Sequence, residues 1–142
     1  METKLLRGDI SVDDRGKVRF INDFDFSGVK RFYQVENHSR GFIRAWHGHT
    51  RESKYVYVAS GSALVGTIDM NFEEGHEHPQ KQVLSAAKPS VLWIPPGYAN
   101  GFKNLEEGTI VIFFSTSTLE ESKGDDIRIN YKRWDIWEED YR

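Results

Sequence analysis

The sequence of 142 residues contains no cysteine, which excludes disulfide bonds, thiol nucleophiles and cysteine-ligated zinc sites. It also lacks an excess of one charge, because 19 Lys and Arg stand against 22 Asp and Glu, and this balance argues against a nucleic-acid partner. No apolar run approaches the ~20 residues of a membrane-spanning helix, and the first residues lack the apolar stretch of a signal peptide. We therefore expect a soluble, cytoplasmic protein that binds neither nucleic acid nor membrane.

Aromatic residues, in contrast, are abundant. They make up 13% of the chain, beside an ordinary total of 38% hydrophobic residues. A chain of this length buries about two-thirds of the surface that its unfolded form exposes, which is enough for one domain with its own core. We therefore expect a single domain over residues 1–142, in which the aromatic rings either fill the core or line a pocket.

Short runs of β-branched and aromatic residues recur along the chain at the spacing of a β-sandwich or barrel. The predicted strands cover residues 17–22, 30–35, 41–47, 54–59, 63–70, 90–94 and 109–115. The run at 54–59 is the richest, which predicts a strand buried on both faces. Residues 72–81 are predicted to form a loop, a capping box predicts a helical turn at 118–121, and the aromatic tail after residue 125 is expected to pack back onto the body. The sequence therefore predicts an all-β fold.

Two short motifs carry the most specific signal, because they resemble the two motifs of the cupin family. The first has a glycine, a His-x-His pair and a second glycine, matched here by Gly41, His47, His49 and Gly61. The second has a Pro-x-Gly turn and a later asparagine, matched here by Pro95, Gly97 and Asn104. The resemblance implies an all-β cupin fold, a double-stranded β-helix or jelly-roll barrel.

The chain departs from the cupin motifs at the metal ligands. A metal-dependent cupin holds its ion with the two histidines of the first motif, a glutamate and a histidine of the second. Here Lys54 stands at the glutamate position and Asn100 at that of the second-motif histidine. An ammonium group repels a divalent cation at such short range, so we expect no metal in this barrel, and no other cofactor is implied. Cationic side chains beside a histidine suit an anionic intermediate instead.

The same segments are similar to those of the dTDP-4-dehydrorhamnose 3,5-epimerases, the RmlC-like cupins. The similarity covers most of the chain and includes Asp14-Arg15-Gly16, Gln34, Asn37-His38-Ser39, residues 41–47, Lys54 and residues 94–102. The resemblance implies a catalytic base at His47, an active-site lysine at Lys54, and substrate contacts at Arg15, Gln34, Asn37 and Arg44. It also implies a nucleotide-linked 4-keto-6-deoxy sugar as the substrate and a homodimer as the assembly.

The chemistry then follows from these residue types. A proton on the carbon next to a ketone is acidic because its loss gives an enolate. His47 would remove this proton, since an imidazole titrates near neutral pH. Lys54, together with Arg44, would hold the enolate oxygen. Reprotonation from the opposite face inverts the carbon and requires a second group that acts as the acid.

Two catalytic groups of the epimerase family have no counterpart at their usual positions. The family's acid is a tyrosine on a late strand, where residues 111–115 offer only phenylalanine rings. Tyr98 and Tyr131 are the candidates to replace it, and both are taken as substrate-binding residues. The aspartate that orients the family's histidine lies in an Asn-Asp-Pro segment, where this chain has Asn130-Tyr131-Lys132. Asp69 is one candidate for the orienting carboxylate.

A second family of small cupins fits the histidines differently. The nucleotide-sugar 3,4-ketoisomerases carry a His-Ala-His segment with both histidines in the active site, and His47-Gly48-His49 resembles this segment. Moving a ketone to the neighbouring carbon shuttles a proton on one face only, so two adjacent bases suffice. The favoured function is therefore the epimerase and the alternative is the ketoisomerase, both isomerases. A sugar-nucleotide-binding cupin without catalysis is the third interpretation.

Three residues near the histidines have two interpretations each. Arg44 and His47 are an odd number of positions apart, so they face one cavity only if a bulge or twist intervenes. Asn100 either contacts the sugar or satisfies the turn that follows the prolines. Trp46 either stacks on the nucleobase or, as we expect, packs into the core.

Overall fold

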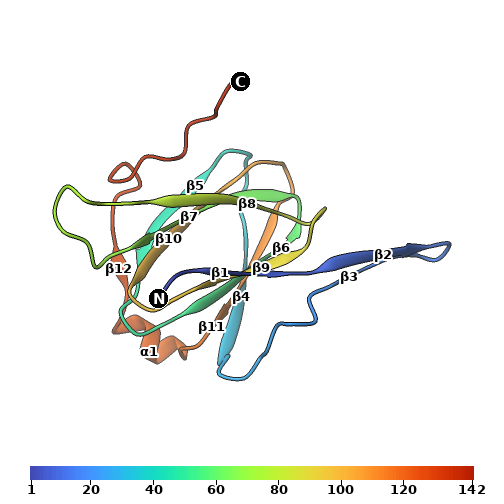
Figure 1. Ribbon diagram of the computed structural model, residues 1–142, viewed down its shortest axis with the longest axis horizontal. Coiled ribbons are helices and arrows are strands. Elements are labelled where there is room, and N and C mark those ends of the chain that lie inside the picture. Colours follow the sequence, from blue (N-terminus) through green and yellow to red (C-terminus); the bar gives the residue numbers. More distant parts are fainter.

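The chain folds into twelve strands and one short helix, and the computed structural model describes all 142 residues (Figure 1). The strands are β1 (Lys4–Arg7), β2 (Asp9–Asp13), β3 (Gly16–Phe20), β4 (Arg31–Glu36), β5 (Ile43–Gly48), β6 (Lys54–Ser60), β7 (Ser62–Asp69), β8 (Gln80–Ser85), β9 (Ser90–Ile94), β10 (Tyr98–Asn104), β11 (Ile110–Ser115) and β12 (Ile127–Arg128). The helix α1 covers Leu119–Lys123. None of the chain's helical structure is long and apolar enough to cross a membrane.

The strands form two five-stranded antiparallel sheets that lie one above the other in Figure 1, as in a jelly-roll barrel. The first sheet has the order β1-β9-β6-β11-β4, and the second has the order β12-β5-β10-β7-β8. Strands β2 and β3 pair with each other in a separate hairpin that extends away from the body, on the side opposite to α1 (Figure 1). The predicted all-β cupin fold is confirmed.

The main core lies between the two sheets. Alternate residues of β6 and β11 point inward, so that Val56, Val58, Val111 and Phe113 are buried together with residues of β7, β9 and β10. Burying each such side chain contributes roughly 1.5–3 kcal/mol. The residues between them face outward, and Tyr55 and Tyr57 are only partly buried. The prediction that residues 54–59 are buried on both faces is therefore wrong, because the outer face of the first sheet is covered only in part, where Phe24 packs against Tyr55.

A second cluster lies on the outer face of the second sheet and is covered by the C-terminal tail. Trp46 of β5 packs there against Trp134 and Trp137, with ring centroids 5.4 and 5.2 Å away. Gly66 of β7 makes this approach possible, because a Cβ at this position would lie 2.8 Å from the Trp46 ring and 3.0 Å from the Trp137 ring. The predictions of a tail packed onto the body and of a core position for Trp46 are confirmed.

Most predicted strands are present with shifts of one or two residues at their ends, and the strand at 90–94 matches β9. The capping box is also confirmed, since Thr118 and Glu121 exchange both hydrogen bonds at the start of α1. Strands β1, β2, β8, β10 and β12 are additions to the predicted set, and β8 begins inside the predicted loop at 72–81.

Candidate functional site

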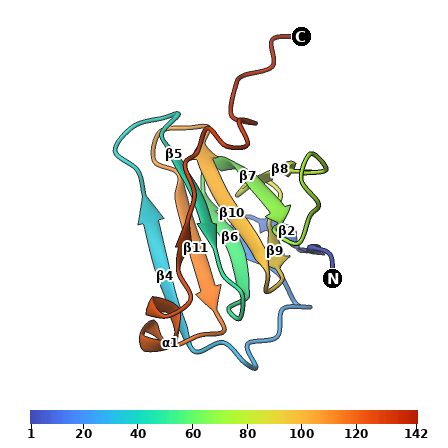
Figure 2. The ribbon, with the colours of Figure 1, turned by 90° about the vertical axis from the view of Figure 1, so that its left-hand side faces the viewer.

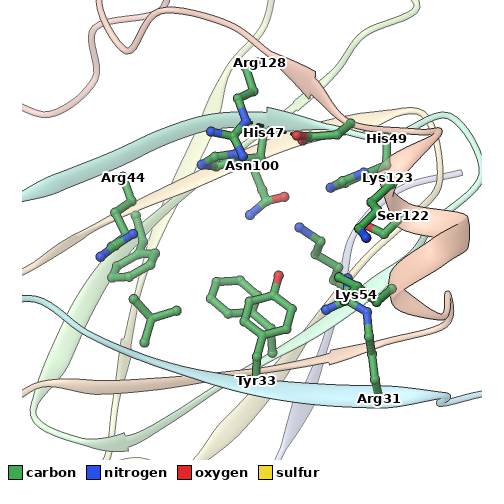
Figure 3. A pocket seen from close by; sticks show the side chains of 15 residues that line it. Arg31, Tyr33, Arg44, His47, His49, Lys54, Asn100, Ser122, Lys123 and Arg128 are labelled. Carbon is green, nitrogen blue, oxygen red and sulfur yellow. Dashed lines mark hydrogen bonds and ion pairs between the residues drawn. The ribbon is translucent and has the colours of Figure 1, made fainter.

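A cavity of about 420 Å³ opens between the two sheets, where β4 of the first sheet faces β5 and β12 of the second (Figure 3). Helix α1 lies beside the ends of β4 and β11 and closes one side of the cavity (Figure 2). Five residues expected from the sequence line this space: Arg44, His47, His49, Lys54 and Asn100. The fold therefore gathers residues of β5, β6 and β10 that the two motifs had singled out.

A bulge in β5 brings Arg44 and His47 to the same cavity. In the pairing with β10, Arg44 lies opposite Phe102 and His47 lies opposite Asn100. From one pair to the other, β5 therefore advances by three residues while β10 advances by two. The bulge turns Trp46 toward the outer tryptophan cluster and leaves both polar side chains on the inner side. The bulge that the sequence required for a shared cavity is present.

His47 has the environment of a base. Its side chain makes no hydrogen bond within the chain, and Figure 3 shows it at the cavity wall beside Arg128 and Asn100. Partial burial lowers the pKa of His47 first, and the charges of Lys54 and Arg128 lower it further, against the opposing charge of Asp126. A histidine with a lowered pKa is neutral at neutral pH and can accept a proton.

His49 is held more firmly than His47. Its Nδ1 lies 2.8 Å from the backbone oxygen of Asp125, and because a carbonyl oxygen only accepts, Nδ1 must carry the proton. Its Nε2 lies 3.4 Å from a carboxylate oxygen of Glu52. Burial and then Lys54 lower the pKa of His49, while Glu52 acts in the opposite direction. Both ring nitrogens thus have neighbours in the chain.

Glu52 is a site residue that the sequence reasoning missed. Its side chain is completely buried in the loop between β5 and β6, below the cavity. One carboxylate oxygen lies 3.4 Å from an Arg31 nitrogen, and the other lies 3.6 Å from the Lys54 Nζ. Burial lowers the pKa of Lys54, and Glu52 opposes this shift. Only the tertiary structure places an acid behind these cations, since the cupin motif expects its glutamate at position 54.

Tyr33 is the second missed residue, and it supplies a hydroxyl group at the cavity. It lies opposite Phe113 in the pairing of β4 with β11, and the two rings stack with centroids 5.1 Å apart. Figure 3 shows its hydroxyl directed into the cavity, across from His47 on the other sheet. Burial, and then the charge of Glu52, raise the pKa of Tyr33, so it keeps its proton. The strand alternation of residues 30–35 is the signal that could have found it.

Asn37 and Asn100 are placed at the site in different ways. Asn37 does not line the cavity, but its amide oxygen accepts a 2.5 Å hydrogen bond from the Nε of Arg44 and so fixes the guanidinium. Asn37 is itself held by the buried Asn104, at 3.1 Å. The side chain of Asn100 points into the cavity and makes no hydrogen bond to the adjacent turn, which favours a contact with a ligand (Figure 3).

The structure does not bring four other expected residues to this cavity within one chain. Gln34 points outward on β4 and donates to Glu36, because the inward positions belong to its neighbours. The Tyr98 hydroxyl donates to the backbone oxygen of Met1, and Tyr131 lies exposed in the tail. Arg15 lies at the tip of the projecting hairpin and pairs with Asp13 at 2.6 Å.

The expectations for these residues are corrected accordingly. Neither Tyr98 nor Tyr131 lines the cavity of its own chain, so neither is placed there to act as the missing acid. Asp69 lies opposite Tyr98 at the end of β7, outside the cavity that His47 lines, and accepts a hydrogen bond from the backbone N–H of Asn71.

The groups at the cavity do not fit a divalent metal ion. No group of three or more His, Cys, Asp or Glu side chains converges anywhere in the structure. The Lys54 ammonium lies among the two histidines and Glu52, and the Nδ1 of His49 donates to a backbone carbonyl. A divalent cation would meet a like charge in place of a fourth ligand.

Asp125 ties the site to the C-terminal segment. Its carboxylate accepts hydrogen bonds of 2.6 to 2.9 Å from the hydroxyl and N–H of Thr50 and from the N–H groups of Arg51 and Glu52. Burial alone would raise the pKa of Asp125, but these hydrogen bonds outweigh it and lower the pKa. Because its backbone oxygen also receives His49, this residue fixes the loop that carries both His49 and Glu52.

Replacing Asp125 with alanine is expected to lower the free energy of unfolding by about 3 kcal/mol, because buried N–H groups lose a charged acceptor. Urea unfolding measures this loss, with Asp140→Ala in the exposed tail as the control. This difference in unfolding free energy has its full size above the ordinary carboxyl pKa of 3.8. It shrinks as the pH falls toward the lowered pKa of Asp125 in the folded chain. A loss that stays constant into strong acid would contradict the role of the carboxylate charge.

Comparisons with known proteins agree with this fold. The family model for dTDP-4-dehydrorhamnose 3,5-epimerase matches residues 3–139. The dTDP-4-dehydrorhamnose 3,5-epimerase of Neisseria gonorrhoeae is 32% identical over 128 residues, covering 81% of this chain and 38% of that protein. This chain therefore spans less than half of that relative's length.

Two solved structures extend the comparison. The dTDP-4-dehydrorhamnose 3,5-epimerase from Sulfolobus tokodaii has 25% identity and a TM-score of 0.77, over 94% of this chain and 81% of that one. A 3,4-ketoisomerase from Helicobacter canadensis shares the fold, with 19% identity and a TM-score of 0.71 over 94% of both chains. The family match covers nearly the whole sequence, and the chain belongs to the dTDP-4-dehydrorhamnose 3,5-epimerase family.

Proposed function

We propose that this protein is a nucleotide-sugar epimerase of deoxysugar biosynthesis in the cytoplasm. Its substrate is a dTDP-linked 4-keto-6-deoxyhexose, which it inverts at C3, C5 or both through an enolate. The observation that carries this proposal is the arrangement across the cavity, where His47 and the Tyr33 hydroxyl come from opposite sheets and Lys54 lies between them (Figure 3).

In the proposed reaction, His47 removes the proton next to the ketone. Its lowered pKa keeps the imidazole neutral before the step. The negative charge that develops on the ketone oxygen is held by the Lys54 ammonium, which is strong in this buried setting because little water screens it. Asn100 supplies a further hydrogen-bond donor at the same cavity.

Inversion requires that the new proton arrive on the face opposite to the base. Tyr33 is suited to this role, because its raised pKa keeps the phenol protonated until the carbanion needs it. The missing tyrosine of the late strand is thus replaced by a tyrosine on the neighbouring strand, directly opposite Phe113. This placement supports inversion of the sugar carbon, rather than transfer of a proton along one face of the sugar.

The cations at the cavity suit the diphosphate of the substrate. Arg44 has no acidic partner, while Arg128 pairs with Asp126 at 3.0 Å and Lys123 pairs with Glu120 at the surface. One guanidinium group can donate to two phosphate oxygens at once. We therefore assign Arg44 and Arg128 to the diphosphate.

The ketoisomerase is the second candidate, and the presence of both His47 and His49 at one cavity favours it. The fixed ring of His49 argues against it, because the Nδ1 proton is already donated and Nε2 faces Glu52. Incubation with dTDP-4-keto-6-deoxyglucose, followed by NMR of the product, separates the two. A 4-ketone with inverted C3 or C5 supports the epimerase, and a 3-ketone supports the ketoisomerase. Binding with no new sugar supports the non-catalytic interpretation.

We also propose that the protein acts as a homodimer. An aromatic patch, defined by Phe24, Phe26, Phe32 and Phe114, lies on the outer face of the first sheet, with ring centroids 4.5 to 6.1 Å apart. The side chains of Phe26 and Phe32 are 62% and 68% exposed, which is costly for such large apolar groups in a monomer. A second copy that covers this patch would bury them.

A dimer also gives Arg15 a role. Within one chain, Arg15 lies on the opposite side of the body from the cavity, so it can reach only the cavity of a partner. We propose that the projecting hairpin delivers Arg15 to the diphosphate bound by the partner. Mixing unfolded Arg15→Ala and His47→Asn chains and refolding them together should restore about a quarter of wild-type activity, since half of the dimers then hold one intact site. If Arg15 served its own chain or no site at all, the mixture would gain nothing over the separate variants.

A further inference from the structure

Glu52 has an unusual environment for a carboxylate. Its side chain has no exposed surface, and one of its oxygens makes no hydrogen bond. Three groups that can carry positive charge lie within 3.4 to 3.6 Å of it, namely Arg31, His49 and Lys54. A buried carboxylate at this depth is stable only when cations compensate its charge.

The three partners of Glu52 belong to different elements but share one property. Arg31 lies on β4, His49 follows β5 and Lys54 begins β6, and all three line the cavity, whereas Glu52 does not. Glu52 therefore lies one layer behind the ligand-facing groups and touches each of them. A residue in this position acts on a ligand only through its partners.

The strongest of these links concerns Lys54. Its side chain is 7% exposed, and its other close neighbours are the rings of Tyr33 and Phe113, with centroids 6.0 and 5.6 Å from the Nζ. Aromatic faces attract an ammonium but do not compensate its charge fully. Glu52 is thus the only carboxylate in contact with this lysine.

We propose that Glu52 is the counter-ion of Lys54, a positioning residue that keeps the lysine charged and aimed at the cavity. For its catalytic consequence, this inference rests on the proposed enolate chemistry. An enolate-stabilising lysine must be an ammonium ion before the substrate proton leaves, and a dry site opposes that charge. Glu52 supplies the missing negative charge without occupying space that the sugar needs.

The other charged groups around Lys54 do not replace Glu52. The charge of Arg31 lowers the pKa of Lys54. The two histidines, Arg128 and Lys123 at the cavity wall supply no negative charge. Asp126 acts in the same direction as Glu52 but contributes less. Tyr33 stays neutral, because burial raises its pKa.

The direction of the effect follows from these charges. Burial already lowers the pKa of Lys54 and Glu52 opposes this, so the neutral Glu52→Gln variant should have a Lys54 pKa that is lower still. The variant then loses the ammonium at a pH where wild type keeps it. We expect the alkaline limb of kcat/KM to move down by about one pH unit or more, while activity on the acid side of that limb is largely kept.

The test compares wild type with Glu52→Gln over the full pH range, with Glu36→Gln as the matched control. Glu36 is exposed on the same strand as Arg31, and its side chain points away from the cavity. A second comparison uses Lys54→Arg, in which the guanidinium does not titrate. In that background, Glu52→Gln should leave the alkaline limb where it is. If Glu52→Gln lowers kcat/KM equally at every pH, in the wild-type or the Lys54→Arg background, Glu52 has a structural role only.

A measurement without substrate keeps the inference separate from the proposed function. In protein labelled with ¹³C at the lysine Cε, the Lys54 signal is the one absent from Lys54→Arg, and its titration midpoint should fall in Glu52→Gln. If Glu52→Gln does not fold, Glu52→Asp replaces it, because the shorter side chain moves the carboxylate away from Lys54. This variant should lower the titration midpoint of Lys54 by less than Glu52→Gln would. An unchanged midpoint overturns the counter-ion, even in an active epimerase. A lowered midpoint in a protein that converts no sugar upholds it and refutes the proposed function.

Discussion

His47→Asn is expected to slow proton exchange on the sugar by roughly 10²–10⁴-fold, the usual contribution of a positioned general base. Asparagine has a similar size but cannot accept a proton at neutral pH, and His47 makes no hydrogen bond in the chain that the change would break. The affinity for dTDP, measured by calorimetry, should change little, because binding of the nucleotide does not require the catalytic base His47. The measurement is the rate of deuterium incorporation into the substrate in D₂O.

The control for this variant is His76→Asn. His76 lies exposed in the loop between β7 and β8, outside the cavity, and its replacement should leave the exchange rate unchanged. In wild type, the rate should fall as the pH drops through the lowered pKa of His47, because the protonated ring no longer accepts. A His47→Asn protein that exchanges at the wild-type rate would sink the assigned base.

Tyr33→Phe is expected to separate exchange from inversion. Without the hydroxyl, His47 still removes the proton and returns a solvent deuteron to the same face, so the sugar becomes labelled but keeps its configuration. We expect inversion to slow by roughly 10²–10⁴-fold while exchange slows far less. NMR of the sugar in D₂O reports both quantities in a single sample.

The control for Tyr33→Phe is Tyr57→Phe, which removes a hydroxyl from the outer face of the first sheet and should change neither rate. Equal loss of exchange and inversion in Tyr33→Phe would show that the hydroxyl orients the substrate or the base. Normal inversion would show that the acid lies elsewhere. Either result would contradict an acid on β4.

Strands with a clear alternating pattern could be predicted from the sequence, whereas β10 could not. Its residues Tyr98–Asn104 include small and polar side chains without a single β-branched one, because the strand is buried between two neighbours and Gly101 lies close against Ala45 in the bulged segment of β5. The loop prediction at 72–81 overran into β8 because Gln80 and Lys81 are polar on an edge strand. Local composition does not reveal such tertiary roles.

Motif spacing found the site residues that lie on the motif strands, but it could not find their partners. His47, His49 and Lys54 were recognisable by their positions in the cupin pattern. Glu52 and Tyr33 gain their roles only when β4 and β6 come together beside β11. Resemblance alone also failed to place Gln34, because a strand directs every second side chain away from the cavity.

In the proposed mechanism, this cavity turns a 4-keto sugar into an enolate and returns the proton from the other face. The direct test is incubation of the wild-type protein with dTDP-4-keto-6-deoxyglucose in D₂O, with the sugar followed by ¹H NMR. We expect deuterium to enter at C3 or C5 and each labelled carbon to appear with inverted configuration. A sugar that binds the protein but retains both protons and its configuration would contradict this mechanism.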